Sequence, residues 1–429
     1  MFSRREWNVL INSFYENRIP AVGWFSMDAS NLAIARSVVS GSSQTRWPGV
    51  VLQLALGTVV AFGFARFDYA LLLPFMRADL GWSYAQAGAL NTVYSLGYLI
   101  GALLAVPVCA SLGLRRSFTA SMLLSAILVG ASGLFSDLGI LLTMRGLTGV
   151  AGAVLFVAGA ALTAEVSHGC DRATLAFGLY CAGAGFGMSL SALFLPTLVD
   201  AVGWRCGWMA LGALSLIAAL IALPGLSRPA SGAPPLAPRT SHWPIRMIAV
   251  ELLGYGLFGV GYIAYATFIV AYLRSSQTLS STETAHFWAL FGASAVGGAF
   301  AWGPIQARLR GGWGAACTIA VVAAGAGVPL ISSTRLAADV SAVMFGGSFL
   351  AVVAAVTSFA QRVAPRSAWT RAIGALTIAV GIGQCIGPVL TGWLSDRFGT
   401  LQSGLALSVL ILFIAAALLP FQHETDLPP

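Results

Sequence analysis

The sequence predicts an all-α membrane protein with twelve transmembrane helices in two pseudo-symmetric six-helix bundles. Hydrophobic residues make up 58% of the 429 residues and charged residues only 9%, against roughly 25% in an average soluble domain. Apolar runs of about 20 residues, long enough to span a bilayer, recur between polar or Gly/Pro-rich segments. A Pro/Ser/Ala-rich stretch divides these runs into two groups of six.

The first group lies within residues 48–225, which we predict to form the N-terminal six-helix bundle. Each helix is predicted where an apolar run lies between polar or Gly/Pro punctuation. In order, the predicted helices are 48–76, 83–110, 117–136, 138–165, 173–200 and 204–225.

The second group lies within residues 246–421, the predicted C-terminal six-helix bundle. Its helices are expected at 246–273, 284–306, 313–332, 336–362, 371–395 and 401–421. Residues 226–245, which contain LSRPASGAPPLAPRTSHWP, are too rich in proline to pack as a helix and form the predicted cytoplasmic linker. Residues 1–47 lack the apolar core of a secretory signal, so we interpret them as a cytoplasmic tail, like residues 422–429.

Arginine placement predicts the orientation. All 23 basic residues are arginine, and 16 of them fall on the side of the two termini. The opposite side holds five arginines, and an acidic residue accompanies each of them. These five are Arg77, Arg205, Arg274, Arg335 and Arg397. Because cytoplasmic loops are enriched in basic residues, we expect a multi-pass protein of a bacterial inner membrane with both termini cytoplasmic. The basic face suits lipid headgroups, and the spread of the arginines argues against a nucleic-acid partner.

The two halves repeat one another at a constant offset, as duplicated transporter units do. A shift of 196 places Arg66 on Tyr262 and Tyr69 on Tyr265. A shift of 198 places Gly183 on Gly381. Tyr262 is therefore expected to face Arg66.

These features resemble the major facilitator superfamily, and GFARFDYALLLPFMRADLGWS in the first helix resembles its bacterial YbfB/YjiJ-like branch. Arg145-Gly146-Leu147-Thr148-Gly149 matches the family's buried-arginine motif. The resemblance implies a monomeric secondary transporter, not an enzyme, that works without a cofactor by symport or antiport. Its partners would be a small-molecule substrate, protons or a counter-substrate, and membrane lipids.

The family's inner-loop gating motif is degraded in this chain. Its basic residues would be Arg115, Arg116, Arg308 and Arg310, but the expected aspartate is absent. Asp396-Arg397-Phe398-Gly399 resembles the motif at the opposite face, where we interpret it as a helix-end cap with a local ion pair.

Arg66 and Arg145 lie inside apolar runs, where each costs roughly 2.5 to 3.5 kcal/mol in lipid. The family fold would bring both guanidinium groups toward one aqueous cavity, and such forks suit a carboxylate, sulfonate or phosphate. We therefore expect a small organic anion as substrate. Alternatively, Asp68 pairs with one of the arginines and merely fixes the packing of helices.

Further binding candidates lie on the first predicted helix and on polar stripes of the second, seventh and eleventh. They are Tyr69, Asn91, Tyr94, Tyr255, Tyr262, Tyr265 and Gln384. Each stripe could instead bridge helices. Asp68 and Glu251 are the candidates for proton coupling, although Glu251 could simply pair with Arg246.

Other functions of a membrane protein remain open from the residues alone. Hydrophobic drug or metabolite efflux is the nearest alternative, and a channel or receptor is more remote. Gly130-Ala131-Ser132-Gly133 resembles an intramembrane protease motif, but no histidine is expected deep in a helix. Of the six cysteines only Cys206 lies near the outer face, so we expect no external disulfide, and without a paired-cysteine motif we expect no metal site.

Overall fold

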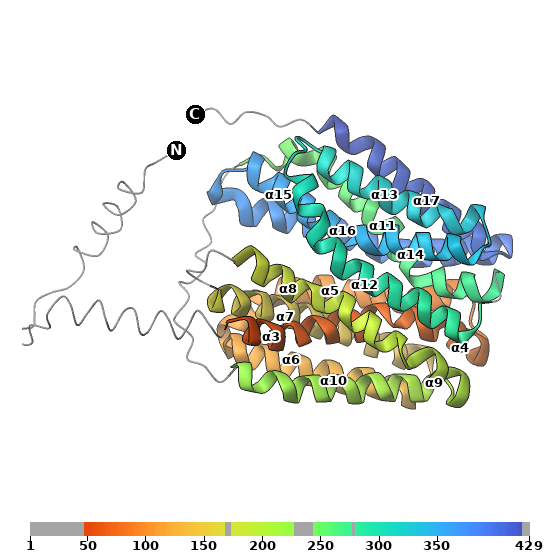
Figure 1. Cartoon of the computed structure of the whole chain (residues 1–429). Helices are drawn as coiled ribbons and strands as arrows, with labels where there is room; N and C mark the ends of the chain where they lie inside the picture. The colour runs from red at the N-terminus through yellow and green to blue at the C-terminus, as the bar shows by residue number, and fades with distance from the viewer. Residues whose placement is uncertain (1–46, 168–172, 227–242, 277–278, 423–429) are drawn as a thin grey trace, which may run out of the picture. The chain divides into compact units, whose positions relative to one another are not determined.

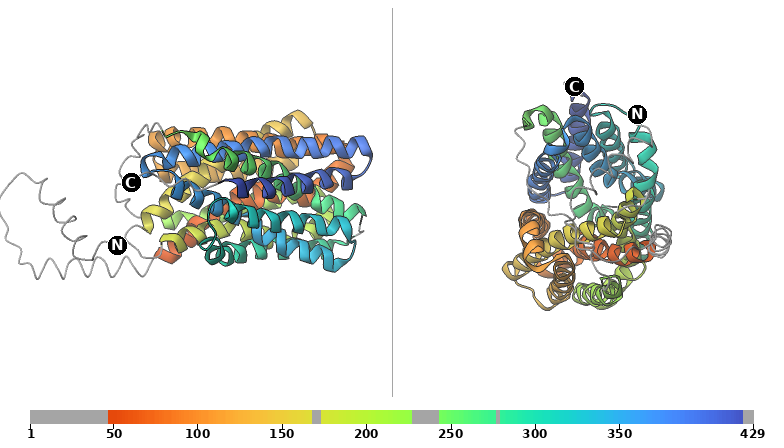
Figure 2. Two further views of the ribbon diagram at one scale, coloured as in Figure 1. Left: turned by 90° about the horizontal axis from the view of Figure 1, so that it is seen from above. Right: turned by 90° about the vertical axis from the view of Figure 1, so that its left-hand side faces the viewer.

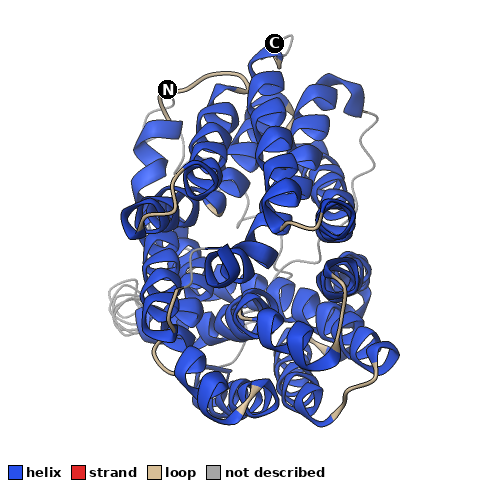
Figure 3. Cartoon of the chain, turned by 90° about the vertical axis from the view of Figure 1, so that its right-hand side faces the viewer, coloured by secondary structure: helices blue, strands red, loops and turns tan. Residues whose placement is uncertain are grey.

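The computed structural model describes residues 47–167, 173–226, 243–276 and 279–422. Within these ranges every regular element is a helix (Figure 3). The predicted tails lie almost wholly outside the described residues, as does most of the linker. The all-helical prediction is confirmed for the described part of the chain.

The first six predicted spans become helices close to their predicted bounds. The first combines three elements, α3 (Trp47–Thr58), the π-helix η1 (Val59–Phe67) and α4 (Tyr69–Leu80). The others are α5 (Tyr84–Leu112), α6 (Leu114–Ala131) with the short η2 (Ser132–Leu134), α7 (Leu138–Val166), α8 (Ala173–Ala192), α9 (Leu195–Val202) and α10 (Trp204–Leu226). The span predicted at 173–200 is therefore broken between α8 and α9.

The second six follow the same order. They are η3 (Ile245–Ile248) with α11 (Ala249–Ser276), α12 (Ser281–Gln306), α13 (Trp313–Ile331), α14 (Arg335–Phe349) with α15 (Ala351–Val363), η4 (Arg366–Ala368) with α16 (Trp369–Phe398), and α17 (Leu401–Leu418) with η5 (Leu419–Phe421). The span predicted at 336–362 is interrupted at Leu350.

Eleven of the twelve predicted spans correspond to helices of the described residues that are long and apolar enough to cross a membrane. The predicted span 284–306 is missing from these eleven. It corresponds to α12, a helix of 26 residues in which Gly, Ser and Trp dilute the apolar residues.

The helices up to α10 form one group and those from α11 onward a second group beside it (Figure 1). Within each group the helices run along a common direction (Figure 2). Helix α5 packs on α16, and α8 packs on α12, so these two pairs join the halves. We call the end where α5 begins and α16 ends the distal end. At the opposite, proximal end, Gly225 of α10 lies beside Gln53 of α3.

The π-helix η1 is the irregular element that matters most for the site. Its wider turn is closed by Asp68, whose amide donates to the Gly63 carbonyl at 3.0 Å. Helix α4 then begins at Tyr69. Such π segments are rare and frequently lie at functional sites. Here the segment carries Arg66 near the middle of a 34-residue span.

Candidate functional site

Arg66 contacts two polar side chains of the opposite half. Its Nη2 donates to Gln384 Oε1 at 2.6 Å and lies 3.5 Å from the Tyr262 hydroxyl. Gln384 Nε2 in turn donates to the Tyr262 hydroxyl at 2.8 Å. These three residues, the Arg66 cluster, come from η1, α11 and α16. The contact between Arg66 and Tyr262 that the internal repeat predicts is present.

The Arg66 cation is buried, and none of the described residues gives it an anionic partner. Arg66 is 3% exposed, and its Nε has no hydrogen-bond acceptor among these residues. Its guanidinium carbon lies 5.5 to 5.7 Å from the ring centres of Phe67, Tyr94 and Tyr98. Aromatic rings attract a cation through their electron-rich faces but carry no net charge. The described residues therefore surround this positive charge with dipoles and rings rather than with a negative charge.

Arg145 occupies a different environment within the N-terminal half. One of its terminal nitrogens donates to the Ala65 carbonyl of η1, while Nε and Nη2 are buried with no acceptor in the described part of the chain. Its guanidinium carbon lies 5.0 Å, 4.8 Å and 5.5 Å from the ring centres of Tyr69, Tyr94 and Trp208. Arg145 thus binds the backbone of the π-helix that carries Arg66.

The two arginines are neighbours, but they do not share one set of partners. Both guanidinium groups lie against the Tyr94 ring, whose hydroxyl donates to the Ala61 carbonyl at 2.8 Å. Arg66 reaches the C-terminal half, whereas Arg145 is 1% exposed and contacts residues of its own half. Here the structure differs from the prediction that both face one aqueous space. A ring cage that encloses a helix-borne cation cannot be inferred from sequence spacing.

Asp68 pairs with neither arginine. Its Oδ1 accepts a hydrogen bond from Trp288 Nε1 of α12 at 2.9 Å, and the Ser191 hydroxyl of α8 also interacts with the carboxyl group. Its Oδ2 has no hydrogen bond of good geometry with a described residue. No carboxylate of the described residues forms an ion pair with Arg66 or Arg145. The alternative of an internal ion pair through Asp68 is therefore wrong in this structure. Asp68 points from the helix toward α12, while Arg66 reaches α11 and α16.

The remaining predicted binding residues lie outside the Arg66 cluster. Asn91 Nδ2 donates to Thr267 Oγ1 at 2.6 Å and so links the two halves. The Tyr69 hydroxyl donates to the Ala87 carbonyl at 2.7 Å. The Tyr265 hydroxyl is 2.6 Å from Ser341 Oγ, within its own half. For these three residues the hydrogen bonds match the alternative of bridges between helices.

Tyr255 belongs to a stack of aromatic rings that ends beside Arg66. Its ring stacks on Phe258 at 5.9 Å, and Phe258 stacks on Tyr262 at 4.7 Å. Tyr262 also stacks on Phe349 of α14 at 6.1 Å. The stack fixes the Tyr262 ring and holds its hydroxyl toward Arg66 and Gln384.

Glu251, the second proton-coupling candidate, and the predicted gating residues lie toward the proximal end. Glu251 is fully buried, and neither carboxylate oxygen has a hydrogen-bond partner among the described residues. Its charge interacts electrostatically with Arg362. Arg246 is exposed and forms no salt bridge with Glu251 in the described part of the chain, so the alternative of a simple Glu251–Arg246 salt bridge is wrong. Of the gating candidates, Arg116, Arg308 and Arg310 are exposed and Arg115 is half-buried. None of these four forms an ion pair with a described residue.

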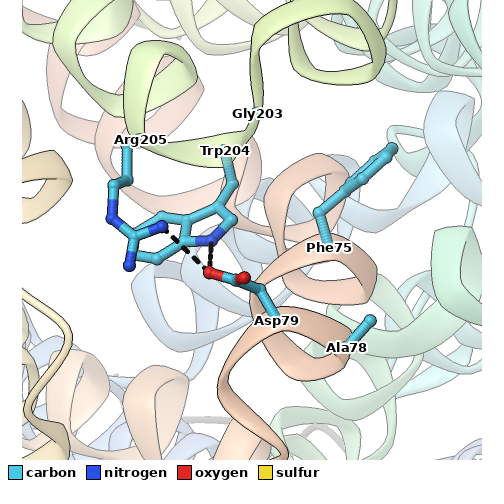
Figure 4. A pocket seen from close by; sticks show the side chains of 6 residues that line it. All are labelled: Phe75, Ala78, Asp79, Gly203, Trp204 and Arg205. Carbon is cyan, nitrogen blue, oxygen red and sulfur yellow. Dashed lines mark hydrogen bonds and ion pairs between the residues drawn. The ribbon is translucent and has the colours of Figure 1, made fainter.

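A surface pocket lies at the distal end of the N-terminal half, between α4 and the start of α10 (Figure 4). Within it, Asp79 accepts hydrogen bonds from Trp204 Nε1 and from Arg205, both at 2.9 Å. The two charged residues of this pocket, Asp79 and Arg205, pair with each other and are partly exposed. Arg66, by contrast, is buried and has neutral described partners. The residues that line it are Phe75, Ala78, Asp79, Gly203, Trp204 and Arg205.

Sequence reasoning missed the two tryptophans that complete these sites, Trp288 at Asp68 and Trp208 at Arg145. Neither belongs to a polar stripe or a motif, and their partners are far away in the sequence. The protease alternative finds no support, because Ser132 Oγ donates to the Leu128 carbonyl of its own helix. His286, the histidine that the described residues contain, is exposed and lies 3.3 Å from Asp339.

A family model described as "Uncharacterised MFS-type transporter YbfB" matches residues 58–420. The chain belongs to this YbfB family of the major facilitator superfamily. As a YbfB-family protein it is a multi-pass membrane protein and a secondary transporter of a small molecule, not an enzyme. The resemblance read from the first helix and the buried-arginine motif is confirmed.

Curated relatives of this YbfB-family chain have names that point to different compounds or to none. The puromycin resistance protein pur8 of Streptomyces alboniger is 30% identical over 42% of this chain and 35% of its own length. The hexuronate transporter of Escherichia coli is 27% identical over 41% of this chain and 40% of its own length. The chain thus matches less than half of either protein. The Escherichia coli inner membrane transport protein YdhP is 24% identical over 85% of this chain and 95% of its own length.

Solved structures agree with the fold of the YbfB-family chain. A crystal structure of a mutant of the nucleoside transporter NupG superposes with a TM-score of 0.72 at 13% identity. The match covers 87% of this chain and 99% of that one. At this identity the likeness shows the major facilitator fold alone.

Proposed function

We propose that this transporter moves a small organic anion by alternating access, with Arg66 as the residue that binds the anion. One observation carries the proposal: Arg66 is a buried cation at the contact between the two halves, and its described partners are neutral. Burying an unpaired charge is costly. A bound carboxylate, sulfonate or phosphate would supply the missing charge.

Gln384 occupies the position that an anion would take. Its amide oxygen accepts the 2.6 Å hydrogen bond from Arg66 Nη2, and the Arg66 Nε donor remains free. A carboxylate could replace the amide oxygen and bind both nitrogens of the fork. Tyr262, which accepts from Gln384, would then be free to donate to the ligand. Binding would in this way alter contacts between the two halves, as alternating access requires.

Arg145 supports the site in two ways. Its charge adds to the positive potential around the Tyr94 ring, and its hydrogen bond to Ala65 holds the turn of η1 that presents Arg66. Arg145 thus favours anion binding without direct contact in the described conformation.

Proton coupling would use the buried carboxyl groups of Asp68 and Glu251. Each has at least one oxygen without a hydrogen-bond partner among the described residues, and neither belongs to a salt bridge of these residues. Protonation removes a buried negative charge, whereas deprotonation restores it. Asp68 is the better placed of the two, because Trp288 of the other half donates to it. We expect Asp68→Asn to retain exchange of substrate but to lose uptake driven by a pH gradient.

We also propose that the protein lies in the bacterial inner membrane with both termini cytoplasmic. The excess of arginine on the side of the termini supports this orientation. The proximal end would then face the cytoplasm and the distal end the outside.

The test is uptake into proteoliposomes over a panel of organic anions, neutral sugars and lipophilic cations, with imposed pH gradients. Native protein is compared with Arg66→Gln and Arg145→Gln. We expect an anion to be accumulated by the native protein and by neither variant. Arg205→Gln is the matched control, because Arg205 pairs with Asp79 at the surface. If no anion competes or accumulates, the substrate assignment fails.

Efflux of flat, lipophilic compounds is the second candidate. The stack of Tyr255, Phe258, Tyr262 and Phe349 supports it, as does the similarity to pur8. Such a function would need the rings rather than the charge. It predicts that Arg66→Gln leaves transport of lipophilic compounds largely intact.

A further inference from the structure

The start of α5 depends on a residue of the other half. The first four amides of a helix have no partner within it. Ser83 and Gln86 form a reciprocal capping box that satisfies two of them, the amides of Ser83 and Gln86. The amides between them, those of Tyr84 and Ala85, donate to Oδ1 and Oδ2 of Asp396, each at 2.8 Å. Asp396 lies near the end of α16 in the C-terminal half.

This contact differs from the local helix cap that the sequence predicts for Asp396. The carboxylate caps a distant helix and makes no ion pair with Arg397. A negative charge at a helix start is favourable because the amide dipoles point toward it. The backbone also comes close here, since Gly392 of α16 lies against the main chain of Tyr84. A side chain at position 392 would separate the two helices.

Helix α12 is the counterpart of α5, since each is the second membrane helix of its half. The comparison shows what the cap by Asp396 adds. It begins with the same capping box, in which Ser280 and Glu283 bond to each other's amides. No described side chain caps the amides of Ser281 and Thr282 between them. A capping box alone therefore starts such a helix, and the cap by Asp396 is an additional contact between the halves.

The halves make further contacts at two places. Arg274 of α11 pairs with Asp200 of α9 at 3.2 Å, toward the distal end, and lies 4.7 Å from the Phe75 ring centre. Between α5 and α16, farther from the distal end than the Asp396 cap, Thr92 Oγ1 donates to the Cys385 carbonyl at 2.8 Å. Helices α5 and α16 thus pack together from the distal end inward, and we call this contact the seam.

We propose that Asp396 is the latch of a distal gate, formed by the seam between α5 and α16. To open the distal end, the halves must part there and break both hydrogen bonds from Asp396. The amides of Tyr84 and Ala85 would then lose their partners. Asp396 consequently biases the transporter toward the conformation that is closed at the distal end. This inference concerns the transport cycle and is independent of which substrate is moved.

The test measures the capped amides and the seam in Asp396→Asn and Asp396→Ala. Hydrogen–deuterium exchange of peptides that contain Tyr84 and Ala85 is followed in lipid nanodiscs. We expect about tenfold faster exchange in the variants, from the loss of charge-assisted hydrogen bonds. The exchange of Ser281 and Thr282 should not change, and it serves as the internal reference.

Labelling of the native Cys385 measures opening of the seam. A membrane-impermeant maleimide is added to sealed vesicles from the side that exposes the distal end. Labelling of Cys206, at the distal start of α10, identifies that side. The peptides that contain Cys206 and Cys385 are then quantified by mass spectrometry. Faster labelling of Cys385 in the Asp396 variants, with unchanged labelling of Cys206, supports the latch. Arg274→Gln, which breaks the salt bridge between α11 and α9 at the distal end, should act in the same direction.

Asp79→Asn is the matched control. It removes an acid at the distal end whose ion pair stays within one half. It should alter neither the exchange of Tyr84 and Ala85 nor the labelling of Cys385. Faster amide exchange in Asp396→Asn with unchanged Cys385 labelling would overturn the proposal, because Asp396 would then be only a helix cap. Unchanged exchange would overturn it as well.

Discussion

At the scale of single residues, the charge of Arg66 is the feature to explain. An arginine inside a membrane helix usually pairs with an acid or faces water. Arg66 has Gln384 and Tyr262 as hydrogen-bond partners, and Asp68 is turned toward Trp288. A neutral amide satisfies a hydrogen-bond donor but leaves the positive charge in place. The site is consequently suited to an anion that binds reversibly.

Gln384→Glu gives a direct test of this argument. A carboxylate at position 384 would bond to Arg66 as the substrate is proposed to do. We expect transport of the anion to be lost and the unfolding temperature to rise, because a buried pair replaces a buried single charge. Transport in proteoliposomes and thermal unfolding of the purified protein check the two effects.

Gln384→Met is the control for that change, since it removes the amide without adding a charge. It should weaken transport without raising the unfolding temperature. If Gln384→Glu transports as the native protein does, Gln384 does not occupy the anion position.

Some of this site could be predicted from the sequence. The arginines are visible because charge is rare in apolar runs, and Tyr262 is visible through the repeat offset of 196. The partners of Asp68 and Arg145 were not predictable, because Trp288 and Trp208 approach them from other helices. Spacing along one helix says which residues share a face. It does not say which side chain of a neighbouring helix they meet.

At the scale of elements, the π-helix η1 decides where Arg66 points. The Ala61 and Ala65 carbonyls of this segment accept hydrogen bonds from Tyr94 and Arg145. Apolar periodicity predicts the span but not its π turn, since a π-helix and an α-helix bury the same kinds of residue. The breaks after α8 and α14 were also missed, because the apolar character continues across them.

Gly63→Ala tests the packing of this element. A Cβ atom at position 63 would lie 2.9 Å from the Gly187 Cα of α8, closer than two such atoms approach. We expect a loss of stability of about 1 to 3 kcal/mol and reduced transport, since η1 would have to shift. Thermal unfolding and uptake measure the two effects.

Gly49→Ala is the matched control in the same span, because nothing lies within 4 Å of a Cβ atom there. It should be neutral or slightly stabilising. Equal effects of the two substitutions would show that the contact between Gly63 and Gly187 does not constrain η1.

At the scale of the whole molecule, two six-helix groups meet through α5 with α16 and α8 with α12. The count of spans and the repeat predict this arrangement, because each group must bury its polar residues against the other. The exact residue boundaries of the two bundles, the linker and the tails stay a prediction. Cross-half bonds at Arg66, Asn91 and Asp396 lie along the same interface.

Counterflow tests the alternating use of one site by the whole molecule. Vesicles preloaded with unlabelled substrate should take up labelled substrate faster than empty ones, and the uptake should saturate. After releasing labelled substrate inside, a carrier must turn its binding site back to the outside. Unlabelled substrate inside the vesicle can bind during this return step and so speed the next round of labelled uptake. Uptake that is unaffected by preloading and does not saturate would instead indicate a pore.

The central claim is that Arg66 holds the anion, and equilibrium binding tests it most directly. Binding of the anion identified by the uptake panel is measured by calorimetry for native protein, Arg66→Gln and the surface control Arg205→Gln. The loss of a charged hydrogen-bond donor is expected to cost about 2 kcal/mol or more, a dissociation constant at least about 30-fold larger for Arg66→Gln. Arg205→Gln should bind as the native protein does. Equal affinity of the native protein and Arg66→Gln would contradict the claim.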